Sequence, residues 1–301
     1  MRAPGSAVVI ATALLSNALV LAAPAARADV VYEQRITSSR PAGMGPAEAR
    51  NKVYVKSGRE RSEMSVEASP AGPSPATTSD FISITRLDRS LIWYLDPAKK
   101  VYSETTFAEL QKALAPTPGA AAGGGAAPAS EVRVERPGTK DVVCGAPAEL
   151  VVLTIASPLT DPALQGATQY IVAELWMATD FPGAAELEAH ARATVDAAGF
   201  AHLAGPGGAG PMGHLMKRLA EEIKKLDGTA IRTVLSLEID ASAGVAGLTS
   251  PAPAHAEGRQ VILAMTTEMT KIESKELPPD LFEIPAGYVK VEPTAPGKKP
   301  G

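Results

Sequence analysis

The amino-acid sequence predicts an α+β protein: an antiparallel β-sheet with two or three α-helices covering one of its faces. Three observations lead to this prediction. Apolar and polar residues alternate over much of the chain, as they do in strands with one buried and one wet face. Three other segments follow the helical period. Two of these helical segments stand between predicted strands, where they can cover the sheet.

The predicted strands are defined by this alternation. It is clearest in residues 229–240, where Ile231, Leu235, Leu237 and Ile239 share one face. Short turn segments follow several of the strands so closely that three consecutive strands should form a meander. Further strands are expected at residues 29–38, 52–56, 59–67, 81–87, 90–95, 100–105, 168–178 and 260–275.

Three helices are expected. Thr106 and Glu109 form a capping box, and the helix that they start should end before Pro116. The second helix should run from about residue 180 to residue 198. In the third, apolar residues recur at the spacing i, i+3, i+4, i+7, which gives one apolar face. These residues are Met212, Leu215, Met216, Leu219, Ile223 and Leu226.

Residues 1–28 have the features of a signal peptide. Arg2 precedes an apolar stretch, and Ala26-Arg27-Ala28 is an A-x-A cleavage site. We expect cleavage after Ala28 and a periplasmic or secreted location. The apolar stretch is shorter than the roughly 20 residues that a membrane-spanning helix needs, and no later stretch reaches that length, so no membrane span is expected.

The remaining chain divides into a domain at residues 29–292 and a disordered tail at 293–301. Four segments of the domain consist mostly of Pro, Gly, Ala, Ser and Thr: residues 68–78, 115–130, 204–211 and 249–256. Such composition buries too little apolar surface to offset the entropy of ordering, so we interpret them as mobile loops. The segment at 115–130 is expected to separate two halves of one sheet.

Composition argues against several functions. The formal net charge is −4 and only 4% of residues are aromatic, which disfavours nucleic-acid binding. Cys144 is the one cysteine, so no internal disulfide can form, and we interpret it as a small buried residue.

No catalytic or metal-binding motif is present in the sequence. None of the four histidines stands in an H-E-x-x-H motif, and His255 lies in a Pro/Ala-rich loop. Glu186 and His190 are one helical turn apart, which we interpret as a solvated surface contact. The Gly-rich residues 205–213 lack the Gly-Lys-Ser/Thr ending of a phosphate-binding loop. We therefore expect no enzymatic activity, no cofactor and no metal.

The segment from Thr270 to Tyr288 resembles the closing segment of an exported family of unknown function, number 4412, whose members end in a similar Phe-x-x-Pro-x-Gly-Tyr turn. Physically, Phe282 and Ile284 should alternate into the core of a strand that Pro285 ends. Residues 49–64, 84–104 and 168–198 are similar to the same family.

That family in turn resembles the half-barrel superfamily of the lipoprotein carrier LolA and acceptor LolB. This resemblance implies a curved antiparallel sheet wrapped over a few helices, with an apolar cavity between them. It brings no catalytic residues, and no functional residue of the carriers can be matched to a position here.

We therefore expect a LolA-like half-barrel that binds a lipid, an acyl chain or a lipoprotein, with the third helix as a movable lid. The alternative is a protein-interaction or stress-sensing module of the cell envelope without a small-molecule ligand. The candidate cavity residues are Leu175, Met177, Leu215, Met216, Leu219, Leu235, Leu237, Leu263 and Met265.

Overall fold

The computed structural model describes residues 29–39, 47–68, 77–114, 130–159, 166–198, 213–240 and 253–292. The predicted leader 1–28, its cleavage site and the tail 293–301 lie outside these residues. So does the greater part of the four low-complexity segments.

The described chain forms one 13-stranded sheet. Its order is β13-β6-β5-β4-β3-β2-β1-β12-β11-β10-β9-β7, with β8 pairing β9 beside this path. All pairs are antiparallel except the short pair of β13 and β6. The strands are β1 (Val30–Ser39), β2 (Ala47–Lys56), β3 (Arg59–Ala68), β4 (Thr77–Arg86), β5 (Leu91–Asp96), β6 (Val101–Thr106), β7 (Glu131–Glu135), β8 (Lys140–Val143), β9 (Ala146–Pro158), β10 (Thr168–Ala178), β11 (Thr229–Asp240), β12 (Arg259–Ser274) and β13 (Val289–Lys290).

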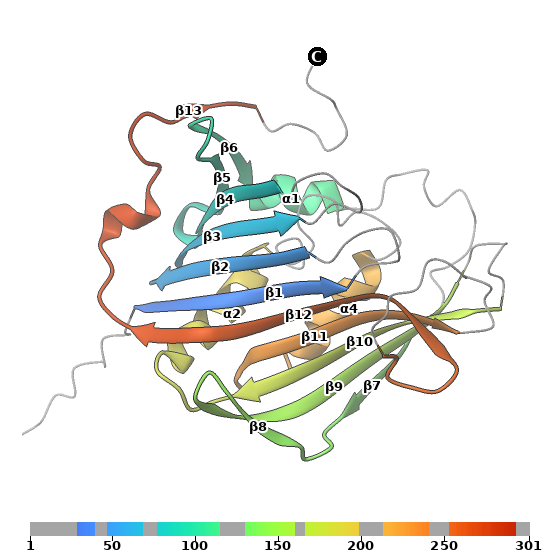
Figure 1. The fold of residues 1–301 in the computed structure, drawn as a ribbon. Helices are drawn as coiled ribbons and strands as arrows, with labels where there is room; N and C mark the ends of the chain where they lie inside the picture. The colour runs from blue at the N-terminus through green and yellow to red at the C-terminus, as the bar shows by residue number, and fades with distance from the viewer. Residues whose placement is uncertain are drawn as a thin grey trace, which may run out of the picture.

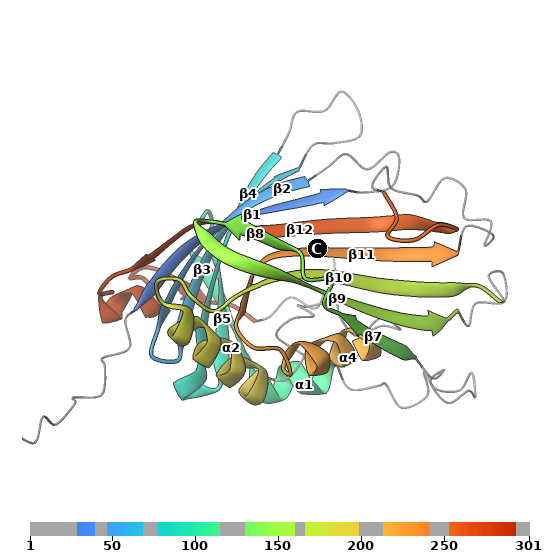
Figure 2. The ribbon, with the colours of Figure 1, turned by 90° about the horizontal axis from the view of Figure 1, so that it is seen from below.

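The sheet is curved and open, and the helices lie on its concave side (Figures 1 and 2). These helices are α1 (Phe107–Leu114), α2 (Ala184–Ala198) and α4 (Gly213–Ile223). The chain also forms two short 3₁₀ helices, η1 (Leu87–Arg89) and η5 (Pro279–Phe282). The predicted fold class, an α+β half-barrel of antiparallel strands covered by α-helices, is confirmed. None of the described helices has the length and apolar character needed to cross a membrane.

Most strands lie where the alternation predicts them, and β10 and β11 match to the residue. The sequence analysis assigned no strand to residues 131–158, which form β7, β8 and β9. In β9 the signal is present, because Val151, Leu153 and Ile155 alternate with less buried residues. Strands β1–β6 precede residues 115–129 and β7–β12 follow them, and the two sets join where β1 pairs with β12.

The capping box at the start of α1 forms as expected. The backbone N–H of Glu109 donates to Thr106 Oγ1 at 3.2 Å, and the N–H of Thr106 donates to Glu109 Oε2 at 2.8 Å. Each side chain thus satisfies a backbone donor that the first helical turn leaves unpaired.

Residues 275–292, here called the C-terminal strap, pack against the face of the sheet opposite the helices. Phe282 is completely buried beside Ile84, Trp93 and Leu95, and Leu277 joins the same cluster. The expected strand through Phe282 and Ile284 is wrong, because residues 279–282 form η5 and Pro279 starts this helix. Phe282 nevertheless enters the core, and Ile284 packs against it half-buried.

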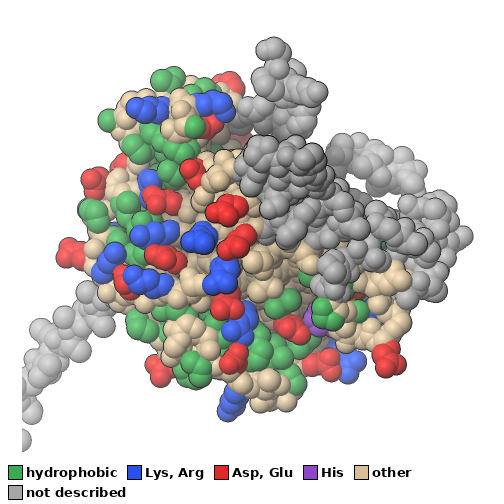
Figure 3. Space-filling model, in the orientation of Figure 1, with side chains coloured by type: hydrophobic (Ala, Val, Ile, Leu, Met, Phe, Trp, Pro, Cys, Tyr) green, Lys and Arg blue, Asp and Glu red, His purple; other side chains and the backbone are tan. Residues whose placement is uncertain are grey.

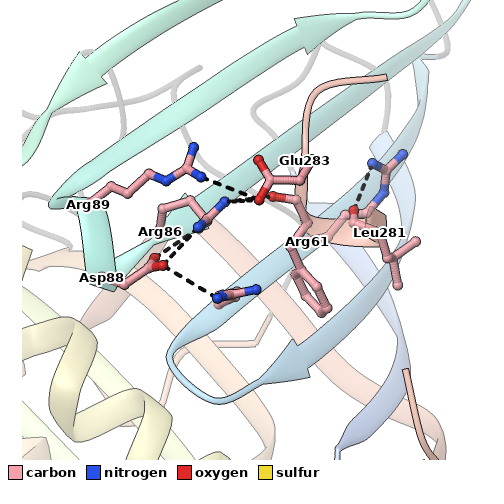
Figure 4. Close-up of polar contacts among 8 residues, drawn as sticks. Arg61, Arg86, Asp88, Arg89, Leu281 and Glu283 are labelled. Atoms are coloured by element: carbon pink, nitrogen blue, oxygen red, sulfur yellow. Dashed lines mark hydrogen bonds and ion pairs between the residues drawn. The ribbon is translucent and has the colours of Figure 1, made fainter. Parts of the chain in front are cut away.

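Two arginines of the sheet hold the strap in place (Figure 4). The side chain of Arg86 is 3% exposed; its Nη1 donates to Glu283 Oε1 at 2.6 Å and to the carbonyl of Phe282 at 3.3 Å. Arg86 also binds Asp88 through two hydrogen bonds of 2.8 and 2.7 Å, which hold the pKa of this carboxyl group below its usual range. Arg61 Nη1 donates to the carbonyl of Leu281 at 3.3 Å.

The start of the strap is joined to the start of β1. Asp29 Oδ2 accepts hydrogen bonds from Lys56 Nζ at 2.6 Å and from the backbone N–H of Leu277 at 2.8 Å. Lys56 also donates to the carbonyl of Leu277 at 2.7 Å. The first described residue is therefore tied to both β2 and the strap.

Candidate functional site

The concave face of the sheet is the candidate binding surface. Cross-strand partners in an antiparallel sheet share a face, so the register extends this face from one strand to the next. Leu219 of α4 belongs to the same apolar cluster as Ile171 of β10, which identifies the covered side. Leu237 lies opposite Ile171, and Leu263 lies opposite Leu237.

Leu175 and Leu219, two of the predicted cavity residues, are part of a closed core. They are 2% and 4% exposed and pack with Val151, Leu153 and Ile155 of β9. Such side chains have no surface to offer a ligand while α4 stays in place. The side chains of Leu215 and Met216 lie outside the described part of the structure.

Met177 lines a small apolar pocket between α2, α4 and strands β10 and β11. Its volume is about 250 Å³, close to the lower end of the roughly 300–1,000 Å³ that ligand pockets occupy. The walls are mainly apolar, with Glu188, Arg192 and Lys224 as the charged lining residues. The hydroxyl of Thr229, another lining residue, is buried and has no hydrogen-bond partner in the described chain.

The four remaining candidates lie on β11 and β12, on the same concave face, where the helices cover them less. Leu235 and Leu237 are half-buried against the core around Leu219. Leu263 and Met265, their cross-strand neighbours on β12, are 42% and 37% exposed. The structure therefore brings the seven candidates whose side chains it describes to the concave side, but divides them between a packed core, a small pocket and an open surface.

The same face carries further apolar residues on β1–β4 that the sequence analysis did not select. Phe81 of β4 is 55% exposed, and the register aligns it with Met64 of β3. Together with the candidates on β11 and β12, they form what we call the concave strip. Its residues are Ile36, Ala49, Met64, Val66, Phe81, Leu235, Leu237, Leu263 and Met265.

The opposite, convex face differs in chemistry. Acidic and basic side chains are interspersed over its central strands (Figure 3). The register places Lys52 between Glu33 and Glu63, and Glu33 between Lys52 and Lys271. This alternation is typical of a solvated face, so apolar binding is expected on the concave side.

A polar cluster on the convex face was missed by the sequence analysis. The imidazole of His255 bridges two carboxylates, with Nδ1 bonded to Glu238 and Nε2 lying 3.3 Å from Glu174. Glu238 is fully buried and also accepts the backbone N–H of His255 at 3.0 Å. Arg259 completes the cluster, with its guanidinium 3.6 Å from the ring centre of Tyr170.

The cluster fixes the charges of its members. Hydrogen bonds to Glu174 and Glu238 raise the pKa of His255 to about 9. Burial alone would raise the pKa of Glu238, but the hydrogen bonds from His255 outweigh burial and hold the pKa below its usual value. His255 is therefore an imidazolium at neutral pH, and its contacts with Glu174 and Glu238 attach the residues around it to the sheet.

This arrangement predicts a pH dependence of stability. The folded-state pKa of His255 lies above its ordinary value of 6.5, so its contribution is complete below about pH 6.5 and is lost as pH rises through about 9. Urea unfolding at both ends of this range should show the loss in the wild type. A His255→Gln variant should show a smaller loss, and equal pH profiles of the two proteins would contradict the assignment.

Glu186 and His190 do not form the solvated surface contact that the sequence analysis expected. Both are buried, and His190 Nε2 lies 3.0 Å from Glu60 Oε2 of β3. Glu186 Oε1 accepts the backbone N–H of Ser57 at 3.3 Å. These contacts attach α2 to the turn between β2 and β3. Burial, together with the charge of Glu60, raises the pKa of nearby Tyr32 above its usual value.

Cys144 is half-buried rather than buried, and it lies in the turn between β8 and β9. Burial, assisted by the charge of Glu268, raises the pKa of its thiol. Among the described residues, no group of three His, Cys, Asp or Glu side chains could hold a metal ion.

No family model matches the chain, and no curated protein matches it. Among solved structures, it is similar to a DUF1329 family protein from Desulfovibrio piger, with 9% identity and a TM-score of 0.28 over 86% of this chain and 91% of that one. A putative outer membrane lipoprotein-sorting protein domain from Vibrio parahaemolyticus has 9% identity and a TM-score of 0.23, over 85% and 89% of the two chains. A β-barrel-like protein of the DUF1849 family from Brucella abortus has 8% identity and a TM-score of 0.24, over 83% and 98%. These values assign neither a family nor a function, and the resemblance to family 4412 is not confirmed.

Proposed function

We propose that the protein is an exported, non-enzymatic binding protein that holds a lipid, an acyl chain or the lipid part of a lipoprotein on its concave face. The observation that carries this proposal is the concave strip. Leu263, Met265 and Phe81 expose much of their apolar surface on the same face of the sheet. Exposed apolar side chains that share one face of a sheet in this way are typical of interaction sites.

The energetics of such binding need no specific polar contact. Burial of apolar surface contributes about 25 cal/mol per Å², so removing about 300 Å² from water favours binding by roughly 7 kcal/mol before the cost of association. The pocket beside Met177 offers a second, enclosed apolar surface on the same side of the sheet.

A fluorescent fatty-acid probe tests the proposal. Leu263→Glu and Met265→Glu place a charge in the strip at positions that are already exposed, so the fold should tolerate them. We expect each to weaken probe binding by about tenfold. Leu219→Glu is not suitable, because Leu219 is buried and the variant would unfold the core rather than report on binding.

Val142→Glu is the matched control, since Val142 is 65% exposed on β8 and lies outside the strip. It should bind the probe as the wild type does. If the folded wild type binds no probe, and organic extraction of protein from its host yields no lipid, the proposal fails. An envelope protein-interaction or stress-sensing module then takes its place.

A further inference from the structure

Among the described residues, half of strand β4 pairs with no strand on the side of β5. β4 pairs with β3 along its whole length, from Thr77 to Arg86. It pairs with β5 only from Ile82 to Arg86, because β5 ends at Asp96 and the chain then turns toward β6. Residues 77–81 therefore have no strand on their β5 side among the residues that the structure describes.

A groove of about 1,030 Å³ lies beside this part of β4. One wall is formed by residues 78–81 of β4, and the other by residues 94–99, where β5 ends. Phe81, 55% exposed, and Tyr94 contribute aromatic surface. The groove also contacts β6 and residues 291–292 of the C-terminal strap.

The charges of the groove are mostly negative. The acidic lining residues are Asp80, Asp96 and Glu292, and the basic one is Lys99. Lys99 Nζ lies 2.6 Å from Asp96 Oδ2, so its charge is already matched. The surplus of carboxylates favours an occupant with positive charge.

We propose that this groove binds an extended, cationic segment of a partner protein, which adds to the sheet as a strand beside residues 77–81. The added strand would continue the line of β5, and five residues would span about 17 Å. Backbone N–H and C=O groups of β4 would supply the hydrogen bonds, Phe81 and Tyr94 the apolar contacts, and the carboxylates the preference for Lys or Arg. A lipid lacks donors and acceptors at the spacing of a strand, so the strand-pairing edge is distinct from the apolar strip, although Phe81 belongs to both.

The test uses a fluorescein-labelled peptide, Lys-Val-Thr-Val-Lys-Val-Thr, as probe. We expect the peptide to bind with a Kd below about 100 μM. Amide hydrogen exchange within residues 77–81 should be roughly tenfold slower when the peptide is bound. Two versions of the peptide, N-methylated on either set of alternate residues, block one or the other edge of the added strand. At least one of them should bind about tenfold more weakly.

Asp80→Lys separates this proposal from the lipid-binding one. Asp80 and Phe81 are consecutive in a strand and point to opposite faces, so Asp80 lies outside the concave strip. The variant should weaken peptide binding by about fivefold and leave fatty-acid binding unchanged. Val142→Ser, at an exposed position of β8 outside the concave strip and the groove, should change neither.

Three results would overturn the inference: no peptide binding at about 1 mM, binding that both N-methylated peptides retain, or binding without protection of residues 77–81. Loss of fatty-acid binding in Asp80→Lys would show that the two sites are not separate. If the protein does not bind the peptide, the fatty-acid measurement still tests the lipid-binding proposal, so the two proposals can be judged independently.

Discussion

Replacing Phe282 by alanine is expected to lower the free energy of unfolding by about 3–5 kcal/mol. The ring is completely buried between the C-terminal strap and the sheet, in contact with the cluster of Ile84, Trp93 and Leu95. Its removal loses the transfer energy of the ring and leaves a cavity. The neighbours on β4 and β5 cannot close this cavity, because strand pairing fixes their positions.

Urea unfolding measures this effect, and Val289→Ala is the control on the same strap. Val289 is 63% exposed, so its truncation should change stability by less than about 0.5 kcal/mol. If Phe282→Ala costs less than about 1 kcal/mol, the strap does not belong to the folded core in solution.

Gly183→Ala should destabilise the protein by about 2–5 kcal/mol. Gly183 immediately precedes α2 and has a φ of +83°, a conformation that costs an L-residue roughly 1–2 kcal/mol. A β-carbon there would also overlap Cγ2 of Val30, a completely buried residue of β1. Either α2 or β1 must move to relieve this overlap.

Gly138→Ala separates the two contributions. Gly138 has a similar φ of +75°, but a β-carbon there would meet no atom within 4 Å. Its substitution should therefore lower the free energy of unfolding only by the roughly 1–2 kcal/mol that the positive φ costs an L-residue. Equal losses in the two variants would mean that the close contact between Gly183 and Val30 contributes nothing.

The sequence predicts the strands well where apolar residues recur at every second position. β10 and β11 could be placed to the residue because Ile171, Ala173, Leu175 and Met177 follow this period in the first, and Leu235, Leu237 and Ile239 in the second. The strap was harder, because Phe282 and Ile284 have the spacing of a strand even though η5 holds the first of them. Pro279, which favours the first turn of a helix, was the signal for the actual structure.

The candidate site could be predicted only as a face. An apolar period shows that Leu175 and Leu263 share the inward face, but not how closely a helix approaches each of them. In the structure α4 covers the first and leaves the second exposed. The bridge from His255 to Glu174 and Glu238 left no local pattern, since strand pairing brings together residues distant in the sequence.

The pairing of β1 with β12 also governs the order in which the fold can form. Most neighbours in the sheet are consecutive hairpins, which close short loops, whereas Val30 and Ser274 enclose roughly 240 residues. Closing a flexible loop of that length costs about 5 kcal/mol of chain entropy, which no contact repays until both strands are present. The two series of hairpins should therefore assemble first, and the seam between them last. Such late closure suits a chain proposed for export, because the complete sheet cannot form until β12, its final long strand, has been released.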